Sequence, residues 1–478
     1  MTETPHLSIK FTQLEKAKLI PQTSAPKIQR VAHYLRDRKH FAKHYSPRLV
    51  SIGPIHHGAK NLLLGEKYKL MWTARYLERT NQDAQTLYQK IASNIKQLKE
   101  LFAEDVIADF PDDEKLSWML LVDGCSLLQI LEKGKLDYPE EMNVKVDQLV
   151  LVWQDVLLLE NQLPYQVLKL LTGPENEAML LNIMKEFLKC HHLSPVRPNH
   201  RAKTQDMDKD ITKQEDRAFT EEGCTSVCTK NESTLQGEHR VEIPQEPPIH
   251  LLDQLRRTVI HDPQKNHQDH RKKDTTSKKK KCKQNKKNED SDIITYRNIK
   301  ELRAAGISLK KSNSRRIKDT SFSCGWLYAE LKLPEITVDD TTAPSFLNLI
   351  AYEMCPDFTN NYEICSFVAF IDSLIDNPDD VKELRKAGIL LNMLGSDEEV
   401  ANLFNTISAD LVPNMEGYSH VRPQIERHYR NKCKTWIALG SHTYFSNPWA
   451  IIAFHAAVLA IVLTFIQTWY AIHPAHAG

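Results

Sequence analysis

The sequence lacks the short motifs by which common enzyme classes are recognised. It contains no G-x-S-x-G nucleophile elbow, no G-x-x-x-x-G-K-[ST] phosphate loop and no G-x-G-x-x-G dinucleotide loop. The H-E-x-x-H helix and the H-x-E…C-x-x-C arrangement of zinc enzymes are also missing. We therefore expect no cofactor and no metal ion, and we predict a protein without enzymatic activity.

Two further absences concern the cellular compartment. The nine cysteines are odd in number and scattered over 478 residues, which argues against a secreted disulfide framework. The first thirty residues lack the apolar core that a secretory signal needs. A reducing compartment is expected, and residues 1–27 are interpreted as a flexible N-terminus.

Charge is absent from the C-terminal region. No Lys, Arg, Asp or Glu occurs from Thr435 to Gly478, and residues 449–472 form a continuous apolar segment. About 20 helical residues are enough to cross the hydrocarbon core of a bilayer. The segment therefore predicts one transmembrane helix, followed by a short tail at 473–478, as in a tail-anchored protein.

Aromatic and basic residues flank this apolar segment in a membrane-like pattern. Trp449 lies at one end and Trp469 and Tyr470 at the other, where interfacial aromatic residues occur. Several Lys and Arg residues precede the segment and none follows it, so the positive-inside rule predicts a cytosolic location for the bulk of the chain. The plasma membrane and the endoplasmic reticulum are the leading candidates. The alternative is a buried core helix.

The net charge of +1 hides a basic strip, because residues 265–287 carry eleven Lys and Arg against two Asp. The surrounding region, 194–291, is polar and nearly free of aromatic residues. We interpret it as a disordered insertion with a short helix near 249–260. Six lysines are candidates for contact with anionic lipid or for nuclear import: Lys278, Lys279, Lys280, Lys281, Lys286 and Lys287. A plain linker is the alternative, and nucleic acid is not expected because the remainder of the chain is acidic.

Apolar spacing predicts a mainly α fold with a small β hairpin or sheet, an α+β class. Residues 28–193 are expected to be helical, and two amphipathic stripes are predicted there: Leu70, Met71, Ala74 and Leu77, then Leu87, Ile91, Ile95, Leu98 and Phe102. Residues 292–445 should contain short strands near 305–338 and then helices. One large helical domain, interrupted by the insertion, thus precedes the transmembrane helix.

The stretch "LLLENQLPYQ" at 157–166 places three polar side chains, Glu160, Asn161 and Gln162, in an apolar surrounding. Pro164 disfavours helix in the residue before it, so we expect the preceding helix to end near these three residues. The ends of two helices then leave backbone groups without partners in the core. Because such groups cost about 1–3 kcal/mol each when unpaired, we interpret the cluster as a structural junction rather than a catalytic carboxylate.

The turn containing Gly53, Pro54, His56 and His57 is the feature that most resembles an active site. Glycine and proline favour a tight turn, which is the structural interpretation. The alternative is a hydrolase in which Asp123, Glu160 and the two histidines converge in one cleft. Asp123 lies inside an apolar helix, where we expect it to have a hydrogen-bonding or charged partner.

A looser metal hypothesis combines His191 and His192 with Cys224 and Cys228. The two cysteines fall in the region interpreted as disordered, and no four-ligand zinc set is apparent. We do not expect a metal site there.

The chain contains a series of distinctive sequence blocks: YSPRLVSIGPIHHG (45–58), LLVDGCSLLQIL (120–131), DVLLLENQLPYQVL (155–168), HLLDQLR (250–256), LNLIAYEMC (347–355), LGSDEEVANLFN (394–405) and YFSNPWA (444–450). They occur in the order found in a plant family known as domain of unknown function 247, which the chain resembles from about residue 28 to the C-terminus. Asp155, Asn348 and Glu353 lie in these blocks, and we assign them structural roles.

The resemblance implies a helical fold, a variable middle region and a C-terminal membrane span, but no biochemical activity. Some members from grasses are linked to the pollen side of self-incompatibility, which suggests protein recognition. We therefore expect a non-enzymatic tail-anchored membrane protein that binds the bilayer through 449–472 and recognises a protein partner, in signalling or reproductive self-recognition. The alternatives are a membrane-tethered hydrolase using the His56-His57 turn and a nuclear factor using the lysine strip.

Overall fold

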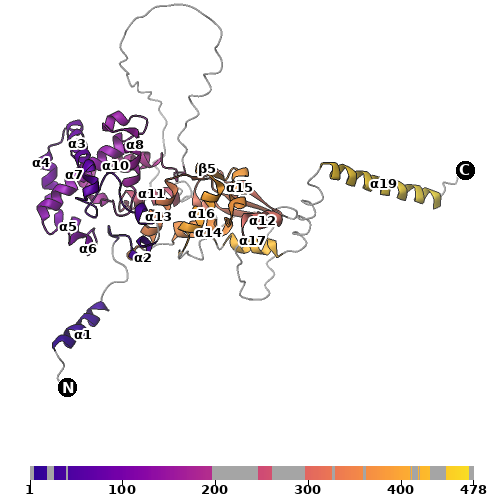
Figure 1. The fold of residues 1–478 in the computed structure, drawn as a ribbon, viewed down its shortest axis with the longest axis horizontal. Coiled ribbons are helices and arrows are strands. Elements are labelled where there is room, and N and C mark those ends of the chain that lie inside the picture. The colour runs from indigo at the N-terminus through magenta and orange to yellow at the C-terminus, as the bar shows by residue number, and fades with distance from the viewer. Residues whose placement is uncertain are drawn as a thin grey trace, which may run out of the picture.

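The computed structural model of the protein describes these residues: 5–18, 26–38, 41–195, 246–260, 297–325, 329–358, 362–409, 411, 418, 420–430 and 448–472. Its described parts are mainly helical with two small sheets, which confirms the predicted fold class (Figure 1). The lysines of the basic strip, Cys224 and Cys228 lie outside the described residues.

Helices are the main regular elements of the described structure before the insertion. They are α1 (Pro5–Ala17), α2 (His33–Arg36), α3 (Leu63–Thr80), α4 (Ala84–Ser93), α5 (Ile95–Lys99), α6 (Glu104–Ile107), α7 (Asp113–Lys133), α8 (Val146–Asp155), α9 (Tyr165–Thr172) and α10 (Glu177–Leu188). Short 3-10 turns lie at Ala42–His44, Lys60–Leu62, Pro139–Met142 and Pro174–Asn176. Helix α1 falls within the segment that the sequence predicted to be flexible.

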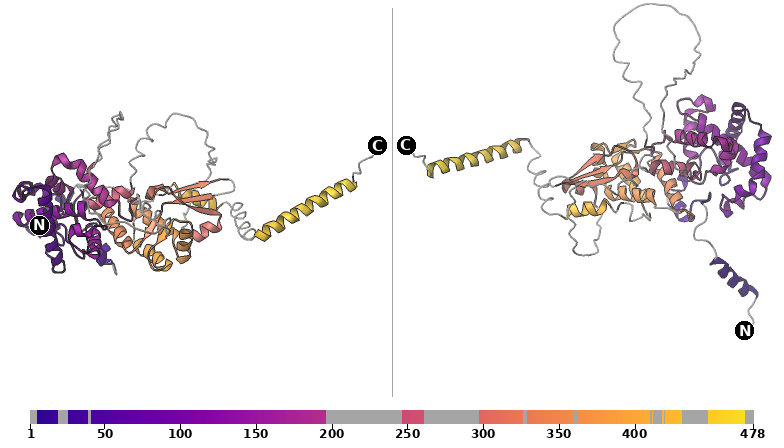
Figure 2. Two further views of the ribbon diagram at one scale, coloured as in Figure 1. Left: turned by 90° about the horizontal axis from the view of Figure 1, so that it is seen from above. Right: turned by 180° about the vertical axis from the view of Figure 1, so that it is seen from behind.

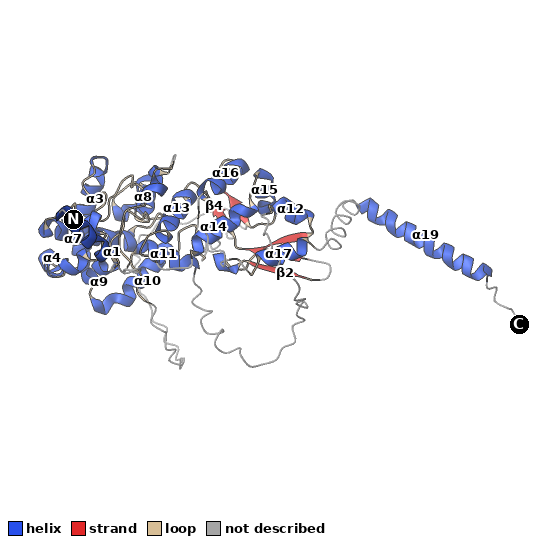
Figure 3. Cartoon of the chain, turned by 90° about the horizontal axis from the view of Figure 1, so that it is seen from below, coloured by secondary structure: helices blue, strands red, loops and turns tan. Residues whose placement is uncertain are grey.

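Helix α7 is the centre of this half, and α3, α4, α9 and α10 pack against it (Figure 3). Asp112 caps its start by accepting hydrogen bonds from the Glu114 and Lys115 N–H groups. From Leu116 to Leu131 nearly every residue is buried. At Gly124 the side chain of Leu171 approaches so closely that an added Cβ would lie 2.4 Å from it, so glycine is needed for α9 to pack here.

One of the two predicted stripes is confirmed and the other is wrong. Leu87, Ile91, Ile95, Leu98 and Phe102 are all buried, as the spacing predicts. On α3, however, Leu70 is 53% exposed. The face that this helix buries consists of Lys69, Trp72, Thr73 and Tyr76. The prediction was wrong because it considered only apolar residues, whereas the buried face of α3 contains a lysine, Lys69.

The second half combines helices with short strands. Its elements are α11 (Leu251–Ile260), α12 (Ile299–Ala304), β1 (Ile307–Lys311), β2 (Ser321–Cys324), β3 (Ala329–Leu333), β4 (Ile336–Val338), α13 (Thr342–Glu353), α14 (Glu363–Leu374), α15 (Pro378–Lys386), β5 (Leu390–Asn392), α16 (Asp397–Ile407) and α17 (Arg422–Tyr429). Strand β3 is the middle strand of a sheet, parallel to β1 and antiparallel to β2. Strands β4 and β5 form a separate parallel pair.

Helix α11 lies in the range that the sequence assigned to the insertion, yet most of its residues are buried. The N–H group of Leu252 donates to Gln162 Oε1 at 3.0 Å, and the Tyr165 N–H donates to the Ile249 carbonyl at 2.7 Å. Its Arg256 forms an ion pair with Glu353 of α13. The short helix is therefore part of the core that joins the two halves (Figure 1).

The last described helix, α19 (Pro448–Ile472), differs from all of these. Its window Ile452–Trp469 has a mean hydropathy of 1.8 and none of it is buried in the rest of the protein. Helix α19 stands apart from the globular body in every view (Figures 1 and 2). By length and composition it is able to span a membrane, as 449–472 was predicted to do.

Replacing Arg256 with Ala is expected to lower the free energy of unfolding by about 3–5 kcal/mol, because Glu353 would remain as a buried unpaired charge. The two side chains are only 10% and 0% exposed. The measurement is urea unfolding of the full-length chain in detergent. As a control, Lys189→Ala breaks an ion pair whose side chains are 47% and 54% exposed, and it should cost less than ~1 kcal/mol. Equal losses in the two variants would contradict a core role for α11.

Candidate functional site

The chain between α8 and α9 runs through the core without regular structure, and Asp155 begins this junction. Its carboxylate accepts hydrogen bonds from three consecutive backbone N–H groups, those of Arg48 at 2.9 Å, Leu49 at 2.7 Å and Val50 at 2.9 Å. Burial raises the pKa of Asp155, and the three N–H donors oppose this rise. Asp155 thus fixes the segment that leads to the His56-His57 turn.

Asn161 and Gln162 hydrogen-bond backbone groups just after α8 and in the segment 50–52. The Asn161 amide donates to the carbonyls of Val50 and Asp155, both at 2.9 Å, and its Oδ1 accepts from the Ile52 N–H at 2.7 Å. The Gln162 amide donates to the carbonyls of Val156 and Leu158, both at 2.8 Å.

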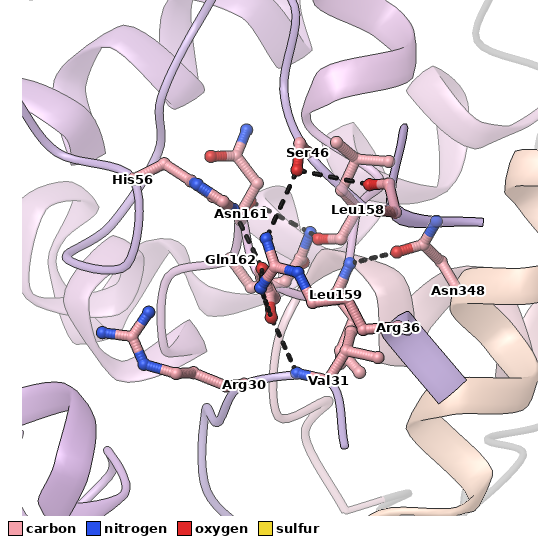
Figure 4. A network of polar contacts seen from close by, with 12 residues as sticks. Arg30, Val31, Arg36, Ser46, His56, Leu158, Leu159, Asn161, Gln162 and Asn348 are labelled. Carbon is pink, nitrogen blue, oxygen red and sulfur yellow. Dashed lines mark hydrogen bonds and ion pairs between the residues drawn. The ribbon is translucent and has the colours of Figure 1, made fainter. Parts of the chain in front are cut away.

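These contacts explain why α8 ends at Asp155, earlier than the sequence predicted. The side chains of two later residues take the carbonyls that further helical N–H groups would otherwise use, so the helix stops before the three polar residues. The view in Figure 4 shows the polar side chains of this junction directed toward the surrounding backbone. All of these hydrogen bonds go to backbone groups, as a structural junction requires, and the structural role stays a prediction.

Glu160 has different partners. Arg36 carries a positive charge, and His56 carries one when its ring is protonated. It accepts from the Val31 N–H at 2.8 Å and from Arg36 Nη1 at 3.0 Å, and its Oε2 lies 3.1 Å from His56 Nε2 (Figure 4). The His56 N–H is not aligned for a hydrogen bond, so this last contact is an ion pair when the ring is protonated. Burial alone would raise the pKa of Glu160, but His56, Arg36 and the Val31 amide together lower it.

Asp123 also has the partner that its position in an apolar helix predicted. Its Oδ1 lies 2.6 Å from Lys69 Nζ, and its Oδ2 accepts from the Gly53 N–H at 2.8 Å. Gly53 has a φ of +79°, and an added Cβ would lie 2.5 Å from the Gln162 carbonyl oxygen. The glycine therefore allows the turn to cross directly over the junction. Burial raises the pKa of Asp123, although Lys69 opposes this.

The side chains of Asn348 and Glu353, both in α13, also accept hydrogen bonds from backbone N–H groups. The Asn348 Oδ1 accepts from the Leu159 N–H at 2.8 Å, and its amide donates to the His44 carbonyl at 2.8 Å. Glu353 accepts from the N–H groups of Ile364 and Cys365, both at 3.0 Å, at the start of α14. Both residues join segments that are far apart in the sequence.

The two adjacent histidines point in different directions. His56 turns inward to Glu160, whereas His57 is exposed and its ring lies 5.7 Å from that of Phe110. The structure thus brings His56 and Glu160 together, but Asp123 contacts Lys69 and Gly53 instead. The described structure thus places an acid beside a base, and neither a serine nor a cysteine described in it is hydrogen-bonded to His56.

The metal hypothesis gains no support from the part of the chain that the structure describes. No group of three His, Cys, Asp or Glu residues there has metal-binding geometry. His191 and His192 contact Ser345 and Thr341 across to α13 and the residue before it.

Comparison with known proteins gives a family. Residues 28–463 match the family DUF247, described as plant protein of unknown function. The chain belongs to this family. It is 23% identical over 444 residues to the UPF0481 protein At3g47200 of Arabidopsis thaliana, covering 90% of this chain and 83% of that protein. It is 28% identical over 175 residues to the putative UPF0481 protein At3g02645 of the same plant, covering 36% and 32%. No solved structure matches.

The DUF247 match includes the junction and both halves of the fold. Sequence reasoning found the acidic and amide residues of the junction but missed their basic partners, Lys69, Arg36 and Arg256. A signal existed for Lys69, because it lies three and seven residues before Trp72 and Tyr76, on the face that α3 buries. For Arg36 and Arg256 no local pattern points to burial.

The lowered pKa of Glu160 predicts a pH dependence. A carboxylate whose folded pKa is below its unfolded value of about 4.3 stabilises the fold above that pH, and the contribution is lost as pH falls through the folded pKa. The native chain should therefore have a higher free energy of unfolding than Glu160→Gln. This difference should be largest near neutral pH and should shrink below about pH 4. Chemical unfolding at a series of pH values measures this.

The matched control is Glu15→Gln, because the Glu15 side chain is 71% exposed on α1. This variant should follow the native chain at every pH. A Glu160→Gln difference that stays constant across the acidic range would show that the charge of Glu160 does not support the fold.

Proposed function

We propose that this DUF247 protein is a non-enzymatic membrane protein, anchored by α19, whose helical body recognises another protein. The observation that carries the proposal is the complete exposure of an uncharged helix of membrane-spanning length. Such a surface is stable only in an apolar environment, because apolar side chains in water cost about 25 cal/mol per Å². A bilayer supplies that environment for a helix of this length.

The residues around α19 support a cytosolic body. Arg427 and Arg430 precede the helix in the described part of the chain, and both are exposed. Cationic residues next to a span favour the cytosolic side. We propose the plasma membrane or the endoplasmic reticulum as the membrane concerned.

The use of the buried polar residues supports recognition rather than catalysis. Asp155, Asn161 and Gln162 are fully engaged with the backbone, and Asp123 is paired with Lys69. A membrane-tethered hydrolase remains the second candidate because His56 lies 3.1 Å from Glu160. In that case Glu160 would have to act as a base while it also accepts hydrogen bonds from Arg36 and from the Val31 N–H group.

A surface pocket beside the His56-His57 turn is our candidate for the recognition surface. It includes Trp118, which is 54% exposed, and its rim carries the carboxylates of Asp109, Asp112 and Glu114 beside a single lysine, Lys115. An exposed tryptophan next to carboxylates fits a protein segment with an apolar anchor and basic neighbours. We propose a partner of that chemistry.

Deletion of 449–472 tests the anchor. The full-length chain should stay in the membrane pellet after an alkaline carbonate wash, and the deleted chain should appear in the supernatant. Removing α1, residues 5–17, is the control and should leave the chain in the pellet. If the full-length chain is released by carbonate, α19 is not a membrane span.

Proximity labelling in native plant membranes tests the recognition. The full-length chain should enrich a reproducible set of neighbouring proteins. Trp118→Ser should lower the enrichment of at least one of them by about tenfold, as expected for a buried interface tryptophan. Leu70→Ser is the matched control, because Leu70 is 53% exposed on α3 and lies outside the pocket. No reproducible neighbour, or equal effects of the two variants, would contradict the proposal.

A further inference from the structure

A second cavity, of about 230 Å³, lies where the two halves of the fold meet. One wall is formed by Trp153 and Gln154 of α8 and by Leu157, which follows this helix. The facing walls come from His191 and His192 after α10, and from Thr341 and the first turn of α13. The cavity is therefore bounded by residues on both sides of the insertion. It is separate from the junction contacts of Glu160 and from the pocket of Trp118.

The hydrogen bonds around His192 determine which of its ring nitrogens carries the proton. Thr341 donates its only hydroxyl proton to Asp339 Oδ1 at 2.7 Å, so at its 3.0 Å contact with His192 Nδ1 it must accept. Nδ1 of His192 therefore carries the hydrogen. Burial lowers the pKa of His192, which favours the neutral ring. In the neutral ring Nε2 is a hydrogen-bond acceptor, and it is buried without a partner.

Gln154 presents a second acceptor of the same kind. Its Oε1 is buried and has no hydrogen-bond partner. Buried polar atoms in folded proteins are nearly always paired, so two unpaired acceptors that belong to residues lining one cavity require an explanation. Both would be satisfied by a molecule that brings N–H or O–H groups.

Ser345 supplies the complementary donor. His191 Nδ1 accepts from the Leu193 N–H at 3.2 Å, so the neutral ring of His191 carries its hydrogen on Nε2 and donates it to Ser345 Oγ at 3.3 Å. Burial lowers the pKa of His191, which keeps this ring neutral as well. The hydroxyl proton of Ser345 is left to donate into the cavity.

We propose that this cavity binds a small uncharged aromatic compound with two hydrogen-bond donors, which donate to His192 Nε2 and Gln154 Oε1. The aromatic part follows from the ring of Trp153, held against Phe187 at 4.3 Å, and from the two imidazole rings, whose centroids are 4.4 Å apart. The absence of charge in the ligand follows from the two neutral histidines and from Asp339, the lining carboxylate, whose Oδ1 already accepts from the hydroxyls of Thr341 and Thr342. The cavity is smaller than the 300–1,000 Å³ of drug-sized sites, so the ligand is correspondingly small. This inference does not rest on the proposed function.

Two related probes test the donor requirement. Resorcinol carries two O–H donors on one ring, and 1,3-dimethoxybenzene has a similar ring with no donor. Calorimetric titration of the full-length chain in detergent, with empty micelles subtracted, should show resorcinol binding. The dimethoxy compound should bind at least about tenfold more weakly, because it leaves both acceptors unpaired.

Three variants locate the binding. Gln154→Leu and Ser345→Ala each remove one polar group and should weaken resorcinol binding about tenfold. Met179→Ala, on α10 outside the cavity, is the control and should bind like the native chain. Far-UV circular dichroism identifies any variant that fails to fold. If one of the two cavity variants does not fold, the affinity of the other for resorcinol tests the proposal.

Equal affinity for the two probes would overturn the proposal. So would resorcinol binding that neither cavity variant weakens, or no binding of resorcinol at millimolar concentration. In the last case water alone satisfies His192 and Gln154, as it does in many polar cavities.

Discussion

The fold depends on satisfying backbone hydrogen-bonding groups where the chain breaks its helix inside the core. Between α8 and α9 the chain is buried, so its carbonyl and N–H groups cannot bind water. Asp155, Asn161 and Gln162 replace the missing helical bonds with side-chain bonds. An apolar substitution at any of these positions would leave several backbone groups unpaired at once. Polar residues occur in this apolar stretch for that reason.

The same junction holds together segments that are distant in the sequence. Glu160 binds Val31 near the N-terminus, and Gln162 binds Leu252 beyond the insertion. Asn348 of α13 binds Leu159. Because the entropic cost of closing a loop grows only with the logarithm of its length, the long segment between the halves adds little to the cost of bringing them together. These buried polar groups therefore connect both halves of the body to one segment, residues 156–164.

The body and α19 place their apolar side chains in different surroundings. The body buries its apolar residues in a core shared by the two halves, whereas α19 exposes its apolar residues around the whole helix. The two recesses described here also differ. The pocket of Trp118 is lined by three carboxylates and one lysine, whereas the cavity of His192 lies between the halves and is lined by three rings together with apolar and hydroxyl side chains.

The sequence by itself determined what depends on near neighbours. The uncharged run of α19 and the absence of helix just before Pro164 follow from residues within one or two helical turns. The break before Pro164 was thus predictable, but the end of α8 at Asp155 depends on the contacts of Asn161 and Gln162.

Tertiary structure alone decided which distant groups pair. The buried face of α3, the burial of α11 and the pairs of Lys69 with Asp123 and Arg256 with Glu353 were not predictable from spacing. A lysine or arginine is normally exposed, and only a carboxylate brought near it by the fold offsets its desolvation. The cavity of His192 likewise exists only because α8, the end of α10 and α13 come together, which no local pattern encodes.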